Sequence, residues 1–180
     1  MQTHTANLGP RSLNLEAMLI RMSLVEIVLR EYRETDLEAI CRVDEDCFAA
    51  AFLFDRKSMR EFAEARNAIC LIAETRHGGV AGFVIVHLGL VDSGLRGYVV
   101  TLDVAEEHRR EGVGSKLLLE AESRAGAAGA RQTELHVFTG NEGAIHFYER
   151  MGYSRLAVRR RFYRTDGLDA FLYRKELAVL

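Results

Sequence analysis

The residues with the clearest chemical potential lie in one short segment, Arg109–Ser115, with the sequence RREGVGS. The segment joins an apolar run at 98–104 to a helical run that begins at Lys116. Glycines let the main chain approach a ligand closely, and the free N–H groups at a helix N-terminus attract phosphate. The spacing R-x-x-G-x-G therefore predicts a phosphate-binding loop, although a simple turn before a helix has the same glycines. The predicted loop residues are Arg109, Arg110, Glu111, Gly112, Val113, Gly114 and Ser115.

A second motif follows at a fixed distance, after one further predicted strand. It reads N-x-x-A-x-x-x-Y-x-x-x-G-Y and runs from Asn141 to Tyr153. The side chain of Asn141 has both donor and acceptor groups, so it can cap a helix and also bind a ligand. Tyr148 shares helical spacing with Ala144 and Met151, which leaves open a purely structural role in the core.

Together the two motifs resemble the central motifs of the GCN5-related N-acetyltransferase (GNAT) superfamily, over about residues 25–176. Within it, the chain is most similar to the protein N-terminal (Nα) acetyltransferases, including the bacterial RimI type. The resemblance implies an α/β fold with a mixed, mostly antiparallel sheet of six to seven strands and about four helices. It also implies direct transfer of an acetyl group from acetyl-CoA to an amine.

The resemblance assigns the donor side of such a reaction to particular residues. The glycine loop would bind the pyrophosphate of acetyl-CoA, and Asn141 its pantetheine arm. In this family the strand before the loop splays from its neighbour, which would free N–H groups of Leu102, Asp103 and Val104; ordinary strand pairing is the alternative. Tyr148 would act as the general acid, because a tyrosine hydroxyl with a pKa of about 10 can protonate a thiolate whose thiol has a pKa of about 8.5.

The general base is the position where the sequence departs from the RimI type. Those enzymes carry a glutamate in a pattern like L-E-V, whereas this chain has His136 in Leu135–Val137. A histidine there is similar to eukaryotic Nα-acetyltransferases, which pair it with a tyrosine that corresponds to Tyr98. An unperturbed histidine with a pKa of about 6.5 is mostly neutral at pH 7.5 and can accept a proton. Glu134 lies on the same strand face and is the rival base, and a merely structural polar role for His136 is also open.

The sequence leaves three hypotheses about the function. Peptide N-termini are favoured, because an α-amine with a pKa of about 8 loses its proton about 3 kcal/mol more easily than a lysine. The resemblance places Phe162 and Tyr163 in a hairpin over the acceptor peptide and Phe48 in an apolar wall. Five arginines between 155 and 164 would favour acidic acceptors or form a solvated strand face. The alternatives are a small amine, such as a polyamine, antibiotic or amino acid, and a non-catalytic CoA-binding sensor.

Alternating strand and helix signals predict a single domain over residues 24–180, after an N-terminal extension at 1–23. One helix is predicted to begin at a Thr35 cap and another at Ser58. Further elements are expected as strands at 25–32, 69–74, 80–88, 98–104, 133–138, 153–163 and 170–176, and as helices at 113–125 and 141–151.

Composition narrows the class of protein. The 180 residues carry a net charge of −2, which predicts no nucleic-acid or membrane partner. Three cysteines without C-x-x-C spacing predict reduced thiols in a cytoplasmic protein, and six scattered histidines predict no metal site. The N-terminus shows no signal-peptide pattern. We expect a monomer or a homodimer.

Overall fold

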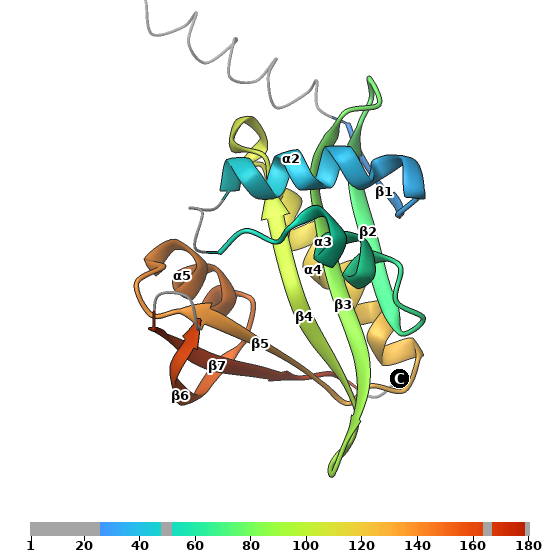
Figure 1. Cartoon of the computed structure of the whole chain (residues 1–180). Helices are drawn as coiled ribbons and strands as arrows, with labels where there is room; N and C mark the ends of the chain where they lie inside the picture. The colour runs from blue at the N-terminus through green and yellow to red at the C-terminus, as the bar shows by residue number, and fades with distance from the viewer. Residues whose placement is uncertain (1–25, 48–51, 164–166, 179–180) are drawn as a thin grey trace, which may run out of the picture.

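The computed structural model describes residues 26–47, 52–163 and 167–178, which form an α/β structure around one sheet (Figure 1). In this part of the chain seven strands pair in the order β1-β2-β3-β4-β5-β7-β6, and every pair is antiparallel except β4–β5. The predicted α/β class and mostly antiparallel sheet are confirmed. The strands are β1 (Ile27–Glu31), β2 (Ala68–Thr75), β3 (Val80–Val91), β4 (Gly94–Val104), β5 (Gln132–Phe138), β6 (Ser154–Tyr163) and β7 (Leu168–Glu176).

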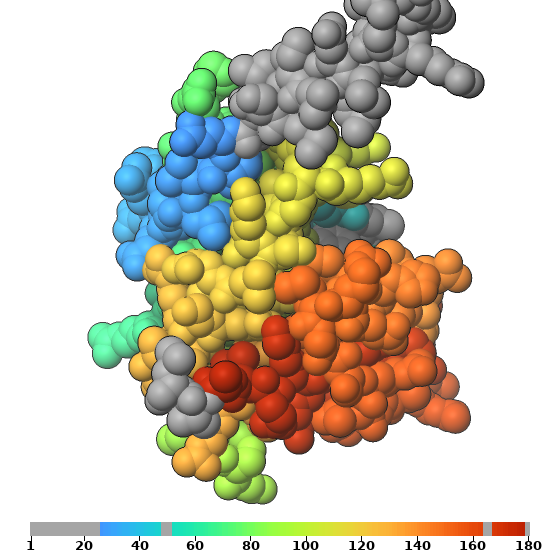
Figure 2. Space-filling view, turned by 180° about the vertical axis from the view of Figure 1, so that it is seen from behind, coloured from blue at the N-terminus to red at the C-terminus, as the bar shows by residue number. Residues whose placement is uncertain are grey.

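Helices cover both faces of the sheet (Figure 1). Their bounds are α2 (Leu37–Cys47), α3 (Arg56–Ala63), α4 (Val113–Ala127) and α5 (Glu142–Arg150), with short 3-10 turns η1 (Glu34–Asp36) and η2 (Glu106–His108). In the view from behind, the gold surface of α4 adjoins the orange and red surface of α5, β6 and β7 (Figure 2).

The strand β3 shows why the sheet is buried on both sides. Successive side chains of a strand point to opposite faces. Phe83 and Ile85 therefore pack in the cluster beneath α2 and α3, whereas Val84 and Val86 pack in the cluster that includes α4. All four are almost fully buried. A near-continuous apolar run is the pattern expected of a strand with a layer on each face.

Two predicted helix starts are wrong. Thr35 is not a helix cap, because the chain first enters the turn η1, where the Asp36 carboxylate accepts a hydrogen bond of 2.8 Å from the backbone N–H of Arg33. The next helix begins at Arg56, before the predicted Ser58. Its cap is Asp55, whose carboxylate accepts from the Ser58 N–H at 2.7 Å. A carboxylate three residues before that amide provides a charge-assisted cap, so Ser58 lies inside the first turn.

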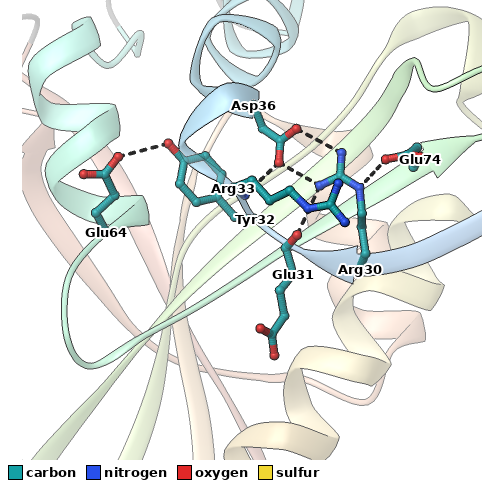
Figure 3. Close-up of polar contacts among 7 residues, drawn as sticks. All are labelled: Arg30, Glu31, Tyr32, Arg33, Asp36, Glu64 and Glu74. Carbon is teal, nitrogen blue, oxygen red and sulfur yellow. Dashed lines mark hydrogen bonds and ion pairs between the residues drawn. The ribbon is translucent and has the colours of Figure 1, made fainter.

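An ion-pair cluster fixes the far edge of the sheet (Figure 3). The guanidinium of Arg30 on β1 donates to Asp36 at 2.7 and 2.9 Å and also to Glu74 on β2. The hydrogen bond from Arg30 keeps the pKa of Asp36 below its ordinary value, against the opposing effect of burial. Nearby, the Tyr32 hydroxyl donates to Glu64 of the segment after α3 at 3.2 Å. These contacts join β1 to its neighbours and lie away from the predicted site.

The sheet opens between β4 and β5. Their parallel pairing covers only Arg96, Gly97 and Tyr98 of β4, and the two strands then diverge (Figure 1). A bulge supports the divergence, since Val99 and Thr101 pair with consecutive residues of β3 and leave Val100 as the extra residue. Beyond Tyr98, β4 therefore pairs only with β3, and a wedge opens beside it.

Candidate active site

The glycine loop has the backbone conformation of an anion-binding turn. Gly112 has a φ of 80° and stands as the N-cap of α4, and Arg110 also has a positive φ of 66°. The first intrahelical bond runs from the Lys116 N–H to the Gly112 carbonyl at 3.0 Å. The N–H groups before Lys116 thus have no partner within the helix, and the positive end of the helix dipole adds to their attraction for phosphate.

A groove of about 630 Å³ runs past this loop. A Cβ atom on Gly112 would meet nothing within 4 Å, so the space at this residue is open to a ligand. The predicted residues Leu102, Asp103 and Val104 pair with β3 and have no partner in β5. The structure therefore excludes ordinary pairing on both sides of this segment, and it brings all but Glu111 of the predicted donor residues to the lining of one groove.

Two of the residues predicted to bind acetyl-CoA have side chains whose polar groups bind other protein groups. The Arg109 guanidinium donates to the Val104 carbonyl at 3.1 Å and to the Cys47 sulfur at 3.4 Å, so it ties α2 to the end of β4. The Asp103 carboxyl is 2% exposed and accepts from the Thr101 hydroxyl at 2.9 Å. Burial, with repulsion from a neighbouring carboxylate, raises its pKa to about 8.

A second cavity, of about 440 Å³, lies within the wedge, because residues of both β4 and β5 line it together with the segment after α2. Tyr148 and Asn141 line both this cavity and the groove, so they stand where the two meet. Burial raises the pKa of Tyr148 above its ordinary value, which keeps the hydroxyl protonated at neutral pH. The Asn141 side-chain oxygen accepts from the Ala144 N–H at 3.0 Å, which confirms its predicted cap role and leaves its amide N–H groups for a ligand.

The side chains of His136 on β5 and Tyr98 on β4 lie within hydrogen-bonding distance of each other. The Tyr98 oxygen lies 2.9 Å from His136 Nδ1, and the tautomer of the histidine decides which atom donates. The Phe162 ring stacks on the other side of the imidazole, with ring centres 4.0 Å apart and planes inclined by 13°. Burial and the nearby charge of Arg159 lower the pKa of His136, while burial raises that of Tyr98 to about 12. At neutral pH the imidazole is therefore neutral and the phenol protonated.

Glu134 occupies a different environment from His136, although it lies on the same strand face. Its carboxylate is 6% exposed and is held by Arg96 at 2.6 Å and by Arg174 at 2.7 Å. Burial opposes its ionisation, but the hydrogen bonds from Arg174 and Arg96 prevail, so its pKa lies below the ordinary value. A carboxylate with a lowered pKa and two cationic partners is a weak proton acceptor.

Three aromatic rings, those of Phe52, Phe138 and Tyr163, line this second cavity. Tyr163 makes an edge contact with Phe52 at 4.8 Å, and Phe52 also packs against Phe138 at 5.3 Å. Phe48, the predicted wall residue, lies outside the described residues. Sequence reasoning did not identify Phe52, Phe138 or the two arginines around Glu134. The run Cys47–Phe52 was a signal for Phe52, but the arginines come from other strands and have no local signal.

Two other features concern the described residues alone. No group of three or more His, Cys, Asp or Glu side chains among them is arranged to hold a metal ion. No helix in the same residues is long and apolar enough to cross a membrane. The three cysteines are free thiols, and Cys70 is buried.

Comparison with known proteins agrees with this fold and site. Residues 27–153 match the family model described as the acetyltransferase (GNAT) family. The chain belongs to this family and is an N-acetyltransferase. Enzymes of this family use acetyl-CoA, and the groove fits such a donor because Gly112 leaves its surface open, the N–H groups before Lys116 have no partner within the helix, and β4 is not paired with β5 beyond Tyr98.

Several relatives are named Nα-acetyltransferases. The chain is 28% identical to the N-alpha-acetyltransferase of Sulfurisphaera tokodaii over 159 residues, which cover 82% of this chain and 91% of that protein. It is 36% identical to N-alpha-acetyltransferase 30 of Schizosaccharomyces pombe over 88 residues, or 49% of this chain and 56% of the relative. The chain thus matches little more than half of that relative's length.

A similar fold occurs in the crystal structure of Arabidopsis thaliana NAA60 in complex with a bisubstrate analogue. The TM-score is 0.75 at 21% identity, covering 86% of this chain and 99% of that chain. At 21% identity this similarity shows a shared fold and nothing about the substrate.

Proposed function

We propose that this protein transfers acetyl directly from acetyl-CoA to the N-terminal α-amine of a protein or peptide. The observation that carries the proposal is the Tyr98–His136 pair, with its 2.9 Å contact, at the acceptor side of the wedge. Tyr148 stands where that side meets the donor groove. The names of the relatives from Sulfurisphaera and Schizosaccharomyces support the same acceptor class.

His136 is the proposed general base. Accepting a proton at Nε2 requires the neutral tautomer that carries its hydrogen on Nδ1, and that N–H then donates to the Tyr98 oxygen. This bond would orient the ring and stabilise the imidazolium that forms. Because the pKa of His136 is lowered, the reactive neutral form prevails at neutral pH. The ion-paired Glu134 has neither the free lone pairs nor the basicity for this role.

Tyr148 is the proposed general acid. Its pKa, raised by burial, keeps a proton on the hydroxyl until a stronger base appears nearby. A thiolate that forms at the junction of groove and cavity is such a base for a positioned phenol. Burial also disfavours the tyrosinate that results, so the proton must be replaced promptly from solvent or from the acceptor nitrogen, which carries an extra proton once it has attacked the thioester carbonyl.

The donor side acts through the backbone. Acetyl-CoA, when bound, supplies a thioester carbonyl that an amine can attack. Within Leu102–Val104, the N–H groups that point away from β3 would hold the pantetheine and polarise that carbonyl, and the first N–H groups of α4 would hold phosphate oxygens. Asn141 would add an amide donor beside them.

The chemistry of the base favours an α-amine over a lysine. At neutral pH an α-amine with a pKa of about 8 needs roughly 3 kcal/mol less for deprotonation than a lysine amine with a pKa of about 10.4. A neutral imidazole of lowered pKa can assist the first but is a weak base for the second. The rings of Phe52, Phe138 and Tyr163 give the acceptor's first side chain an apolar surface.

The test is parallel steady-state kinetics on three acceptors: a short peptide with a free N-terminus, its N-terminally blocked analogue that contains a lysine, and spermidine. We expect acetylation of the free N-terminus at a kcat/KM at least tenfold above that for the other two. Activity confined to spermidine or to the blocked peptide would overturn the proposal in favour of another amine. Binding of acetyl-CoA without turnover of any amine would point to a sensor.

A further inference from the structure

Strand register places Arg159 on the acceptor face of the sheet. Arg159 pairs with Ala170, and Ala170 pairs with Phe138, so these three side chains form one row across β6, β7 and β5. His136 lies two residues from Phe138 on β5 and therefore points to the same face. Arg159 is thus on the side of the sheet where the proposed base meets the acceptor.

The charge of Arg159 has no counter-ion among the described residues. Its side chain is exposed, and neither it nor the neighbouring Arg160 and Arg161 forms an ion pair within that part of the chain. The other arginines on this face, Arg96 and Arg174, share the carboxylate of Glu134.

Among the described residues, few acids oppose these cations near the cavity. Glu142 lines the cavity from the first turn of α5, and Asp169 accepts a hydrogen bond of 2.8 Å from the Arg161 backbone N–H. In this part of the described structure the cations therefore outnumber the acids, although the whole chain has a net charge of −2. The effect reaches the base, since the charge of Arg159 contributes to the lowered pKa of His136.

We propose that Arg159 selects acceptors that carry an acidic side chain at the second or third residue. This rests on the proposed acetylation of peptide N-termini. Adjacent strands lie about 4.8 Å apart, and an extended peptide advances about 3.3 Å per residue. A peptide whose amine reaches His136 therefore brings its second or third side chain within the reach of an arginine two strands away.

The same strand offers a matched control. Arg155 pairs with Tyr173, whose side chain faces the opposite side of the sheet from Ala170, and its guanidinium lies 4.4 Å above the Phe171 ring. Arg155→Gln therefore removes the same charge from the same strand, but away from the acceptor face. Neither arginine lines the cavity itself, so the two differ in the face of the sheet that they occupy.

The experiment measures kcat/KM for peptides that differ only by Glu, Gln or Lys at the second residue, and again at the third. We expect the wild type to prefer Glu over Gln by about 3- to 5-fold at low salt, as for an exposed ion pair. Arg159→Gln should reduce this ratio to within about twofold of unity, and Arg159→Glu should favour Lys. Arg155→Gln should keep the wild-type ratio.

The ratio isolates the charge contact. Removing Arg159 also changes the basicity of His136, but that change affects both peptides equally and cancels. An unchanged Glu-to-Gln ratio in Arg159→Gln, or an equal loss in Arg155→Gln, would overturn the assignment. If the wild type acetylates all three peptides equally, only the acidic preference fails; if it acetylates none, the proposed function fails.

Discussion

The two sides of the wedge are built in different ways. The donor side is almost continuous in sequence, since the end of β4, the glycine loop and the start of α4 all lie within 102–115, and it presents mainly backbone groups. The acceptor side collects side chains from three strands: Tyr98 from β4, His136 from β5 and Phe162 from β6.

This difference predicts how each side responds to mutation. A site made of N–H groups depends on φ angles and on open space, so it tolerates many side-chain changes but not a Cβ at a glycine with positive φ. A site made of side chains depends on single functional groups and on the neighbours that set their pKa values. Four substitutions test the contrast, and they are given in decreasing order of the effect that we expect.

Gly112→Val should abolish acetyl-CoA binding, with a loss of affinity of 100-fold or more. The φ of 80° is strained for a β-branched residue, and its side chain would enter the open groove. The measurement is the rise in melting temperature that acetyl-CoA causes, which should disappear. Gly129→Val is the matched control, because Gly129 has a φ of 96° and equal open space but lies after α4, outside the groove. Wild-type affinity in Gly112→Val would disprove the loop assignment.

Tyr148→Phe should lower kcat by roughly 10- to 100-fold, because it removes the proton donor and keeps the ring. The affinity for acetyl-CoA, measured by calorimetry, should change little. Tyr153→Phe is the control: its hydroxyl is bonded to Thr133 at 2.9 Å in the core and lines neither cavity, so it should cost about 1 kcal/mol of stability and leave kcat intact. Equal turnover in Tyr148→Phe and wild type would remove this tyrosine from the chemistry.

His136→Ala should lower kcat by roughly 10-fold or more and flatten the acid limb of the kcat profile at saturating peptide. The base works when neutral, so activity falls as the pH drops through its pKa. Because burial and the charge of Arg159 lower this pKa from 6.5, the limb should lie below pH 6.5. Arg159→Gln should raise the pKa of His136 and so move the limb to higher pH. The charge of Arg96 would still lower that pKa and the charge of Glu134 would still raise it. A limb that persists in His136→Ala would belong to another group.

Glu134→Gln should change kcat by less than about threefold, measured below its melting temperature. Its main effect should be a loss of about 2 kcal/mol of stability, since Arg96 and Arg174 lose their partner but stay partly exposed. Because the pKa of Glu134 is lowered, the wild type keeps this stabilisation above about pH 4.5 and loses it in more acidic solution. Glu120→Gln, which breaks the exposed pair with Arg124, is the control. An inactive but stable Glu134→Gln protein would make Glu134 the base.

The features that the sequence predicts correctly are those that depend on local physics. Gly112 indicated a backbone with positive φ before a helix, and Asn141 indicated a cap, because each effect involves residues a few positions apart. The strands β2 and β3 followed from the two apolar runs predicted as strands at 69–74 and 80–88. The two missed helix starts show the limit of such patterns, since other side chains, those of Asp36 and Asp55, bind the backbone amides near each start.

The difference between the two candidate bases is visible only in the packed fold. In the sequence, His136 and Glu134 are two polar residues on one strand face. In the fold, Glu134 lies between arginines of β4 and β7, whereas His136 meets Tyr98 and Phe162. The splay of β4 from β5 was likewise visible only in the pairing of the strands. The charges and rings that set each pKa come from strands distant in sequence, and only the packed sheet brings them together.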